Sequence, residues 1–153
     1  HNFEEALFKG LIAAGYKMKK SGGALITVRD TDQPEIAGIA KKFADMGFSL
    51  YATVGTASAI REAGIEVSVV NKIYESDDNT MTLVESGKVD YVISTSAKGR
   101  IPTRDSVKIR RKAVEHAIPC LTSLDTASAL ANILKSGYTQ DNTELVDINN
   151  INN

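Results

Sequence analysis

Hydroxyl-bearing residues stand at the ends of four short apolar runs of this chain, at Thr27, Thr53, Ser94 and Thr122. The segments that follow these runs add further hydroxyl groups and cationic side chains. Hydroxyl groups, backbone N–H groups at helix starts and one or two ammonium or guanidinium groups are the components of phosphate sites in proteins. The spacing therefore predicts an anion site, if the fold brings these segments together.

The stretch from Thr53 to Thr56 is the most distinctive of these segments, because Gly55 lies between two threonines and permits close approach of a ligand to the backbone. The other candidates in the following segments are Lys72, Thr95, Ser96, Lys98 and Arg100. Each has an alternative interpretation. A hydroxyl before a helix is often only an N-cap, worth ~1 kcal/mol. The lysines and arginines would equally suit a solvated surface.

The elements that must position these residues alternate along the chain. Short β-branched or aromatic runs predict strands at residues 24–28, 49–53, 67–70, 91–94 and 119–122. Apolar residues at helical spacing predict helices at residues 34–46, 56–63, 81–86, 105–116 and 125–135, with Asp105 and Asp125 as N-caps. This alternation predicts an α/β fold, a Rossmann-like three-layer αβα sandwich with a five-stranded parallel sheet. Ligands of such sheets bind beyond the carboxyl ends of the strands.

The organisation and composition exclude several classes of protein. We expect a helix in residues 1–16, the α/β domain in residues 17–138 and a polar, flexible tail in residues 139–153. Eighteen basic residues against nineteen acidic ones argue against a protein that binds long nucleic acids. No apolar run approaches the ~20 residues of a membrane span. The single cysteine, Cys120, allows no internal disulfide and fits the cytoplasm.

Catalytic and cofactor motifs are scarce. His116 is the only histidine after the first residue, so with Cys120 it cannot supply an ordinary zinc ligand set. Neither a Gly-x-Gly-x-x-Gly nor a Walker-type run occurs. The carboxylates near the predicted anion site, Asp30, Asp32 and Asp105, each suit a turn or a cap. The sequence therefore predicts binding at the strand ends and no metal or catalytic site.

Several stretches resemble the C-terminal regulatory domain of carbamoyl-phosphate synthase large subunits, which has the methylglyoxal-synthase-like fold. They are FEEALFKGL from Phe3, LITVRD from Leu25, ATVGTA from Ala52, VVNK from Val69 and DSVKIRR from Asp105. The resemblance extends from about Phe3 to Leu134. The first stretch resembles the junction with a preceding synthetase domain, which agrees with a chain that begins without methionine and inside a longer protein.

The resemblance implies a regulatory role without catalytic residues or a cofactor in this domain. The parent enzyme would be a glutamine-hydrolysing, ATP-dependent ligase that uses Mg or Mn and makes carbamoyl phosphate from bicarbonate for pyrimidine and arginine biosynthesis. The domain would bind UMP or phosphoribosyl pyrophosphate as its effector. Its protein partners would be the synthetase domains of the same chain, a small glutaminase subunit and further copies of the parent enzyme, all in the cytoplasm.

Carried over by position, the resemblance implies that Thr53, Thr56 and Lys72 bind the effector phosphate. It places neighbouring nucleotide contacts at Thr27, Thr95, Ser96, Arg100 and Asp105. The chain departs from the family at several of these positions. Gln33 stands where some members have a phosphate-binding lysine, Ser94 stands where they have a ligand-contacting asparagine, and Lys98 is a candidate replacement for the lost cation. Cys120 replaces a tyrosine that contacts ornithine beside Thr122 in some members, so ornithine activation is not expected.

Two alternatives stay open. The first is methylglyoxal synthase, which shares the fold and acts on dihydroxyacetone phosphate. That enzyme uses an aspartate in a Gly-Gly-Asp loop after the fourth strand and a His-Asp pair after the first, where this chain has Lys98-Gly99-Arg100 and Arg29-Asp30. The second is a non-catalytic interaction module, in which the hydroxyl groups cap helices and the loops bind no ligand.

Overall fold

The computed structural model describes residues 2–72, 79–95 and 104–135 of the 153-residue chain. Its helices are α1 (Asn2–Ala13), the 3₁₀ turn η1 (Asp30–Asp32), α2 (Gln33–Asp45), α3 (Val54–Glu62), α4 (Thr80–Glu85), α5 (Arg104–Glu115) and α6 (Leu124–Lys135). Its strands are β1 (Gly23–Thr27), β2 (Ser49–Ala52), β3 (Ser68–Val69), β4 (Tyr91–Ser94) and β5 (Cys120–Leu121).

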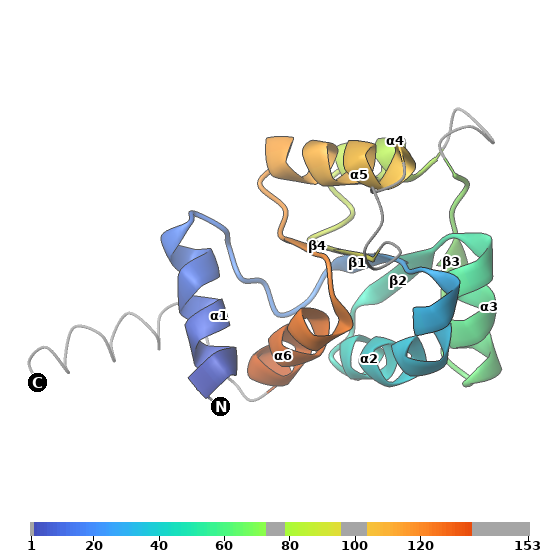
Figure 1. Cartoon of the computed structure of the whole chain (residues 1–153), viewed down its shortest axis with the longest axis horizontal. Coiled ribbons are helices and arrows are strands. Elements are labelled where there is room, and N and C mark those ends of the chain that lie inside the picture. The colour runs from blue at the N-terminus through green and yellow to red at the C-terminus, as the bar shows by residue number, and fades with distance from the viewer. Residues whose placement is uncertain (1, 73–78, 96–103, 136–153) are drawn as a thin grey trace, which may run out of the picture.

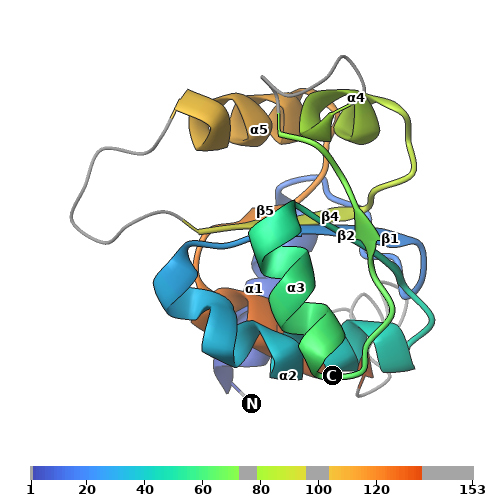
Figure 2. The same ribbon diagram turned by 90° about the vertical axis from the view of Figure 1, so that its right-hand side faces the viewer.

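The five strands form one sheet in the order β3-β2-β1-β4-β5, and every neighbouring pair is parallel. Figures 1 and 2 show helices α4 and α5 on one face of this sheet and helices α2, α3 and α6 on the other. The predicted α/β fold with a parallel five-stranded sheet and helices on both sides is therefore confirmed.

The strand order reverses its direction between β1 and β4. From β1 the chain crosses through α2 to β2 on one side, and from β4 it crosses through α5 to β5 on the other side. In open α/β sheets the crevice outside the carboxyl ends at such a point is the usual place for a ligand. Thr27 and Ser94, the last residues of β1 and β4, are register partners at this point.

Both faces of the central strands β1 and β4 are buried, which explains why these strands have continuous apolar runs instead of alternating ones. Leu25 and Ile26 in β1 are each fully buried, yet Leu25 packs in the core under α4 and α5, whereas Ile26 packs in the core with α2, α3 and α6. In β4, Val92 likewise packs towards α4 and α5, and Ile93 packs on the other side.

Helix α1 packs against α6 and belongs to the larger core. Phe8 of α1 is only 1% exposed and lies in the same cluster as Ile26. On the rim of this contact, Asn132 Nδ2 donates a hydrogen bond of 3.0 Å to Glu4 Oε2. The helix predicted at residues 1–16 is thus packed onto the α/β domain that follows it.

Several element ends differ from the sequence prediction. Helix α3 begins at Val54, two residues before the predicted start, and α5 begins at Arg104, so Asp105 lies inside its first turn and does not precede it. The predicted N-cap at Asp125 is wrong, because Ser123 Oγ accepts the backbone N–H of Thr126 at 3.2 Å in the first turn of α6. Strands β3 and β5 are shorter than predicted.

Candidate functional site

Three hydroxyl-bearing residues from neighbouring strands meet at the carboxyl edge of the sheet. Thr27 ends β1, Thr53 directly follows β2 and Ser94 ends β4. Thr27 Oγ1 lies 3.3 Å from Thr53 Oγ1, although the two residues are far apart in sequence. Because side chains alternate along a strand, Thr27 and Ser94 lie on the same face as Leu25 and Val92, the face covered by α4 and α5. We call these three residues the hydroxyl row.

Thr53 does not cap the helix that it precedes. It occupies the N-cap position of α3 in an extended conformation (φ −71°, ψ 162°), but its side chain makes no cap hydrogen bond. Instead the hydroxyl faces Thr27, and the residue is 7% exposed. The capping interpretation therefore does not apply to Thr53, and its hydroxyl belongs to the site at the sheet edge.

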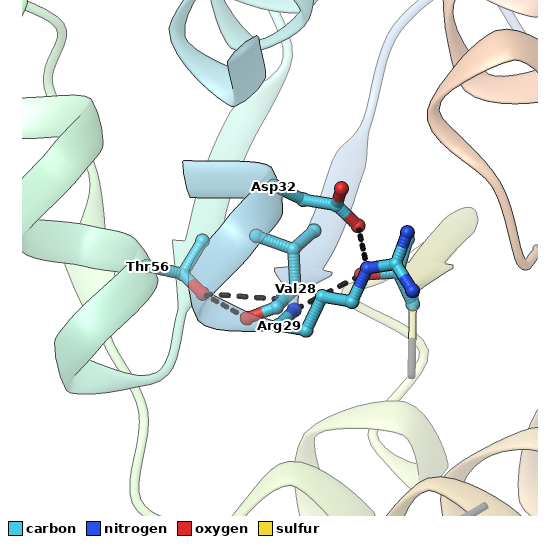
Figure 3. A network of polar contacts seen from close by, with 5 residues as sticks. Val28, Arg29, Asp32 and Thr56 are labelled. Carbon is cyan, nitrogen blue, oxygen red and sulfur yellow. Dashed lines mark hydrogen bonds and ion pairs between the residues drawn. The ribbon is translucent and has the colours of Figure 1, made fainter. Parts of the chain in front are cut away.

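Thr56 uses its hydroxyl inside the protein. Thr56 Oγ1 accepts the backbone N–H of Val28 at 3.2 Å and donates to the carbonyl oxygen of Val28 at 3.5 Å (Figure 3). The residue is 1% exposed. The hydroxyl of Thr56 thus fixes the loop between β1 and α2 against α3, which is a positioning role that the sequence did not indicate.

The β1–α2 loop also contains an ion pair that sequence reasoning did not single out. Arg29 Nε donates to Asp32 Oδ2 at 2.9 Å, and the backbone N–H of Arg29 donates to Thr95 Oγ1 at 3.0 Å (Figure 3). The N–H of Thr95 in turn donates to the carbonyl oxygen of Thr27 at 3.2 Å. These contacts tie the ends of β1 and β4 together. The available signal was an arginine directly after the first strand with an aspartate three positions later.

Ser94 differs from its neighbours because its hydroxyl has no hydrogen-bond partner in the part of the chain that the structure describes. The residue is 1% exposed. A buried hydroxyl without a partner costs about 1–3 kcal/mol, and such groups in native proteins call for an explanation such as a ligand or an ordered water. Ser94 lies beside Thr27 at the point where the strand order reverses.

Of the remaining predicted residues, the structure describes Lys72, Gln33 and Thr122. Lys72 is half-buried just after β3, next to the bridge between Asn71 and Asn79. Gln33 begins α2 and lies against the first turn of α3, since a Cβ on Gly55 would be 3.1 Å from Gln33 Nε2. Thr122 is exposed beyond β5. Three predicted contacts, Ser96, Lys98 and Arg100, lie outside the described residues, and for Asp105 the structure gives only its place in α5.

The described residues show little that could catalyse a reaction. Burial raises the pKa of the Cys120 thiol to about 11, against a smaller opposing effect of the positive charge of Arg110, so this thiol stays protonated near neutral pH. No group of three or more histidine, cysteine or acidic side chains in these residues could hold a metal ion. Within the same ranges, no helix has the length and apolar character that a membrane crossing requires.

Comparisons with known proteins agree with this architecture. A family model described as "MGS-like domain" matches residues 35–122, more than half of the chain. The crystal structure of methylglyoxal synthase from Elizabethkingia anophelis NUHP1 is similar with a TM-score of 0.63 and 18% identity, over 78% of this chain and 84% of that chain. The crystal structure of ForH is similar with a TM-score of 0.56 and 17% identity, over 85% of this chain and 89% of the ForH chain. At this level of identity, the structural similarities show the fold alone.

Proposed function

Because the chain belongs to the MGS-like domain family, we propose that it is a ligand-binding regulatory domain whose effector sits at the carboxyl edge of the sheet. The effector is a phosphorylated nucleotide-type molecule, UMP or phosphoribosyl pyrophosphate. The parent protein in this proposal is the large subunit of a carbamoyl-phosphate synthase, with synthetase domains in the same chain and a glutaminase subunit as partners. Effector binding and catalysis would then be coupled reciprocally, typically by about 1–3 kcal/mol.

The observation that carries the proposal is the hydroxyl row at the point where the strand order reverses. The Thr27 and Thr53 hydroxyls face each other without capping a helix, and the Ser94 hydroxyl is buried without a partner in the described residues. The N-terminus of α3 starts beside this row and contributes backbone N–H groups that favour an anion. Lys72, after β3, supplies a positive charge on the same edge of the sheet.

Binding is favoured over turnover because no side chain that the structure describes at the site is a candidate acid or base. The carboxylate of Asp32 is buried and paired with Arg29. The stretch from Thr95 to Arg100, which follows the fourth strand, contains no aspartate or glutamate in its sequence. A methylglyoxal synthase needs a carboxylate there, so the proposal treats dihydroxyacetone phosphate as a molecule that the chain does not convert.

Calorimetric titration of the 153-residue chain with UMP and with phosphoribosyl pyrophosphate, at low salt with Mg²⁺, tests the proposal. We expect saturable binding of at least one ligand. Lys72→Ala should lower its affinity by about 1.5–3 kcal/mol, the usual worth of a hydrogen bond to a charged group. The matched control is Lys41→Ala, because Lys41 is exposed on α2 and pairs with Asp45 away from the site.

The absence of saturable binding of both ligands would overturn the regulatory proposal and favour an interaction module. Release of phosphate from dihydroxyacetone phosphate by the purified chain would instead support methylglyoxal synthase activity. The assignment to carbamoyl-phosphate synthase has its own test. It predicts that the reading frame upstream of Phe3 encodes an ATP-grasp synthetase domain, and any other upstream domain would contradict it.

A further inference from the structure

Contacts with other described residues hold Arg29 in place at three of its atoms. Its backbone N–H donates to Thr95 Oγ1 at 3.0 Å, its carbonyl oxygen accepts the N–H of Asp32 at 2.9 Å, and its Nε donates to Asp32 Oδ2 at 2.9 Å. The side chains of Arg29 and Asp32 are 30% and 11% exposed. An arginine that is fixed in this way loses less entropy when it binds a ligand than a solvated surface arginine does.

The carboxylate of Asp32 accepts a hydrogen bond from Arg29 and does not cap the helix that Asp32 precedes. Asp32 occupies the N-cap position of α2, where an aspartate ordinarily accepts backbone N–H groups of the first turn. Here its side chain makes no cap hydrogen bond, and its backbone is helical (φ −94°, ψ −9°). The carboxylate is therefore engaged in orienting the Arg29 guanidinium, and we regard Asp32 as a positioning residue.

Arg29 follows β1 and Lys72 follows β3, so the two residues lie at different places along the carboxyl edge of the sheet. Figure 3 shows the guanidinium and Thr56 on opposite sides of the end of β1, and the backbone of Arg29 is bonded to Thr95 beyond β4. Lys72 follows β3, which is separated from β1 by β2. With neighbouring strands ~4.8 Å apart, the ends of β3 and β1 are about 10 Å apart, and those of β3 and β4 about 14 Å.

The buried Ser94 hydroxyl is an independent sign that the site extends to the β4 side. It has no partner in the described ranges, it neighbours Thr27, and the next residue, Thr95, holds Arg29. A polar group of a ligand that crosses from Thr53 over Thr27 would meet Ser94 next. A single phosphate group near Thr53 and Lys72 would leave the Ser94 hydroxyl without a ligand contact.

We propose that Arg29, oriented by Asp32, binds a second anionic group, so that the site prefers a ligand with two separated anionic groups. This inference rests on the proposed function and specifies its ligand class. One anionic group lies at the α3 N-terminus with Lys72, and the other lies on the β4 side with Arg29. A sugar that carries a phosphate on one carbon and a diphosphate on another meets this requirement, whereas a nucleoside monophosphate has only one anionic group.

The test compares phosphoribosyl pyrophosphate and UMP on the 153-residue chain by calorimetry. We expect Arg29→Gln to weaken binding of phosphoribosyl pyrophosphate at least about tenfold, as loss of a hydrogen bond to a charged group does, and to change UMP binding less than about threefold. Asp32→Asn should lower the preference for phosphoribosyl pyrophosphate over UMP by a smaller factor. Lys72→Ala should lower the affinity for both ligands. Arg29→Lys retains the charge but loses the Nε contact. Its affinity for phosphoribosyl pyrophosphate should therefore lie between those of wild type and Arg29→Gln.

The possible failures are distinguishable. If wild type binds neither ligand, the proposed function fails, and this inference fails with it. A second outcome is that wild type binds both ligands and Arg29→Gln leaves the affinity for phosphoribosyl pyrophosphate unchanged, or lowers the affinities for both ligands equally. In that case the inference fails and the regulatory function stands. Urea denaturation of each variant identifies any loss of folding. If Arg29→Gln does not fold, the selective loss must appear in Arg29→Lys, and its absence there overturns the inference.

Discussion

Replacing Ser94 by alanine should raise the free energy of unfolding and lower effector affinity. The hydroxyl is buried in a residue that is 1% exposed, and it has no hydrogen-bond partner among the described residues. Removing such a group relieves a cost of about 1–3 kcal/mol. The small void left by one oxygen atom offsets part of this gain, so we expect a net stabilisation of about 1 kcal/mol. For a chain of this size, that corresponds to a melting temperature higher by about 2–4 °C.

Urea denaturation followed by circular dichroism measures the free energy of unfolding, and Ser123→Ala is the matched control. Ser123 Oγ lies 2.8 Å from Thr126 Oγ1 and accepts the Thr126 N–H in the first turn of α6. Its removal should therefore lower the free energy of unfolding by about 1 kcal/mol and leave effector affinity unchanged. A loss of stability in Ser94→Ala as large as that in Ser123→Ala would refute the reasoning, because it would mean that the Ser94 hydroxyl is hydrogen-bonded within the free protein.

Three further predictions concern stability and are checked by urea denaturation. Thr56→Val should lower the free energy of unfolding by about 1–3 kcal/mol because it leaves the buried N–H of Val28 without its acceptor. Thr56→Ser, which keeps the hydroxyl, should lower the free energy of unfolding less. Burial raises the Cys120 pKa to about 11, from about 9. The unfolded chain thus loses this proton first, so stability should fall between pH 9 and 11, and an equal fall in Cys120→Ala would contradict this assignment. Phe8→Ala should cost about 3–5 kcal/mol, whereas Phe3→Ala, at a position 60% exposed, should cost no more than about 0.5 kcal/mol, and equal losses would contradict the packing of α1.

The sheet could be predicted from the sequence because its central strands, β1 and β4, are buried on both faces. Continuous apolar runs such as the one around Leu25 and Ile26 are typical of such strands, and both side chains are fully buried. The ends of the outer strands were harder to predict. The apolar pattern continues to Val70, whose N–H donates to the carbonyl oxygen of Ala52. Val69 is nevertheless the last residue of β3 with a register partner in β2, and it is 45% exposed.

The general place of the site could also be predicted, since carboxyl ends of parallel strands share one edge of the sheet. The use of each hydroxyl could not, because it depends on backbone conformation and on neighbours distant in sequence. Thr53 and Ser123 both precede helices, yet only Ser123 uses its side chain to accept an N–H group of the first turn. The pairing of Asp32 with Arg29 could not be predicted either, because an aspartate before a helix ordinarily predicts an N-cap.

The central claim is that a phosphorylated effector binds at the carboxyl edge of the sheet. Backbone amide chemical-shift mapping, with phosphoribosyl pyrophosphate or UMP added to the ¹⁵N-labelled chain, tests it most directly. We predict saturable shifts that are largest at Thr27, Arg29, Ser94, Thr95 and the first turn of α3 from Val54 to Thr56. Shifts centred on the opposite edge of the sheet, near Gly23 and Asp90, or no shifts at millimolar ligand, would contradict the claim.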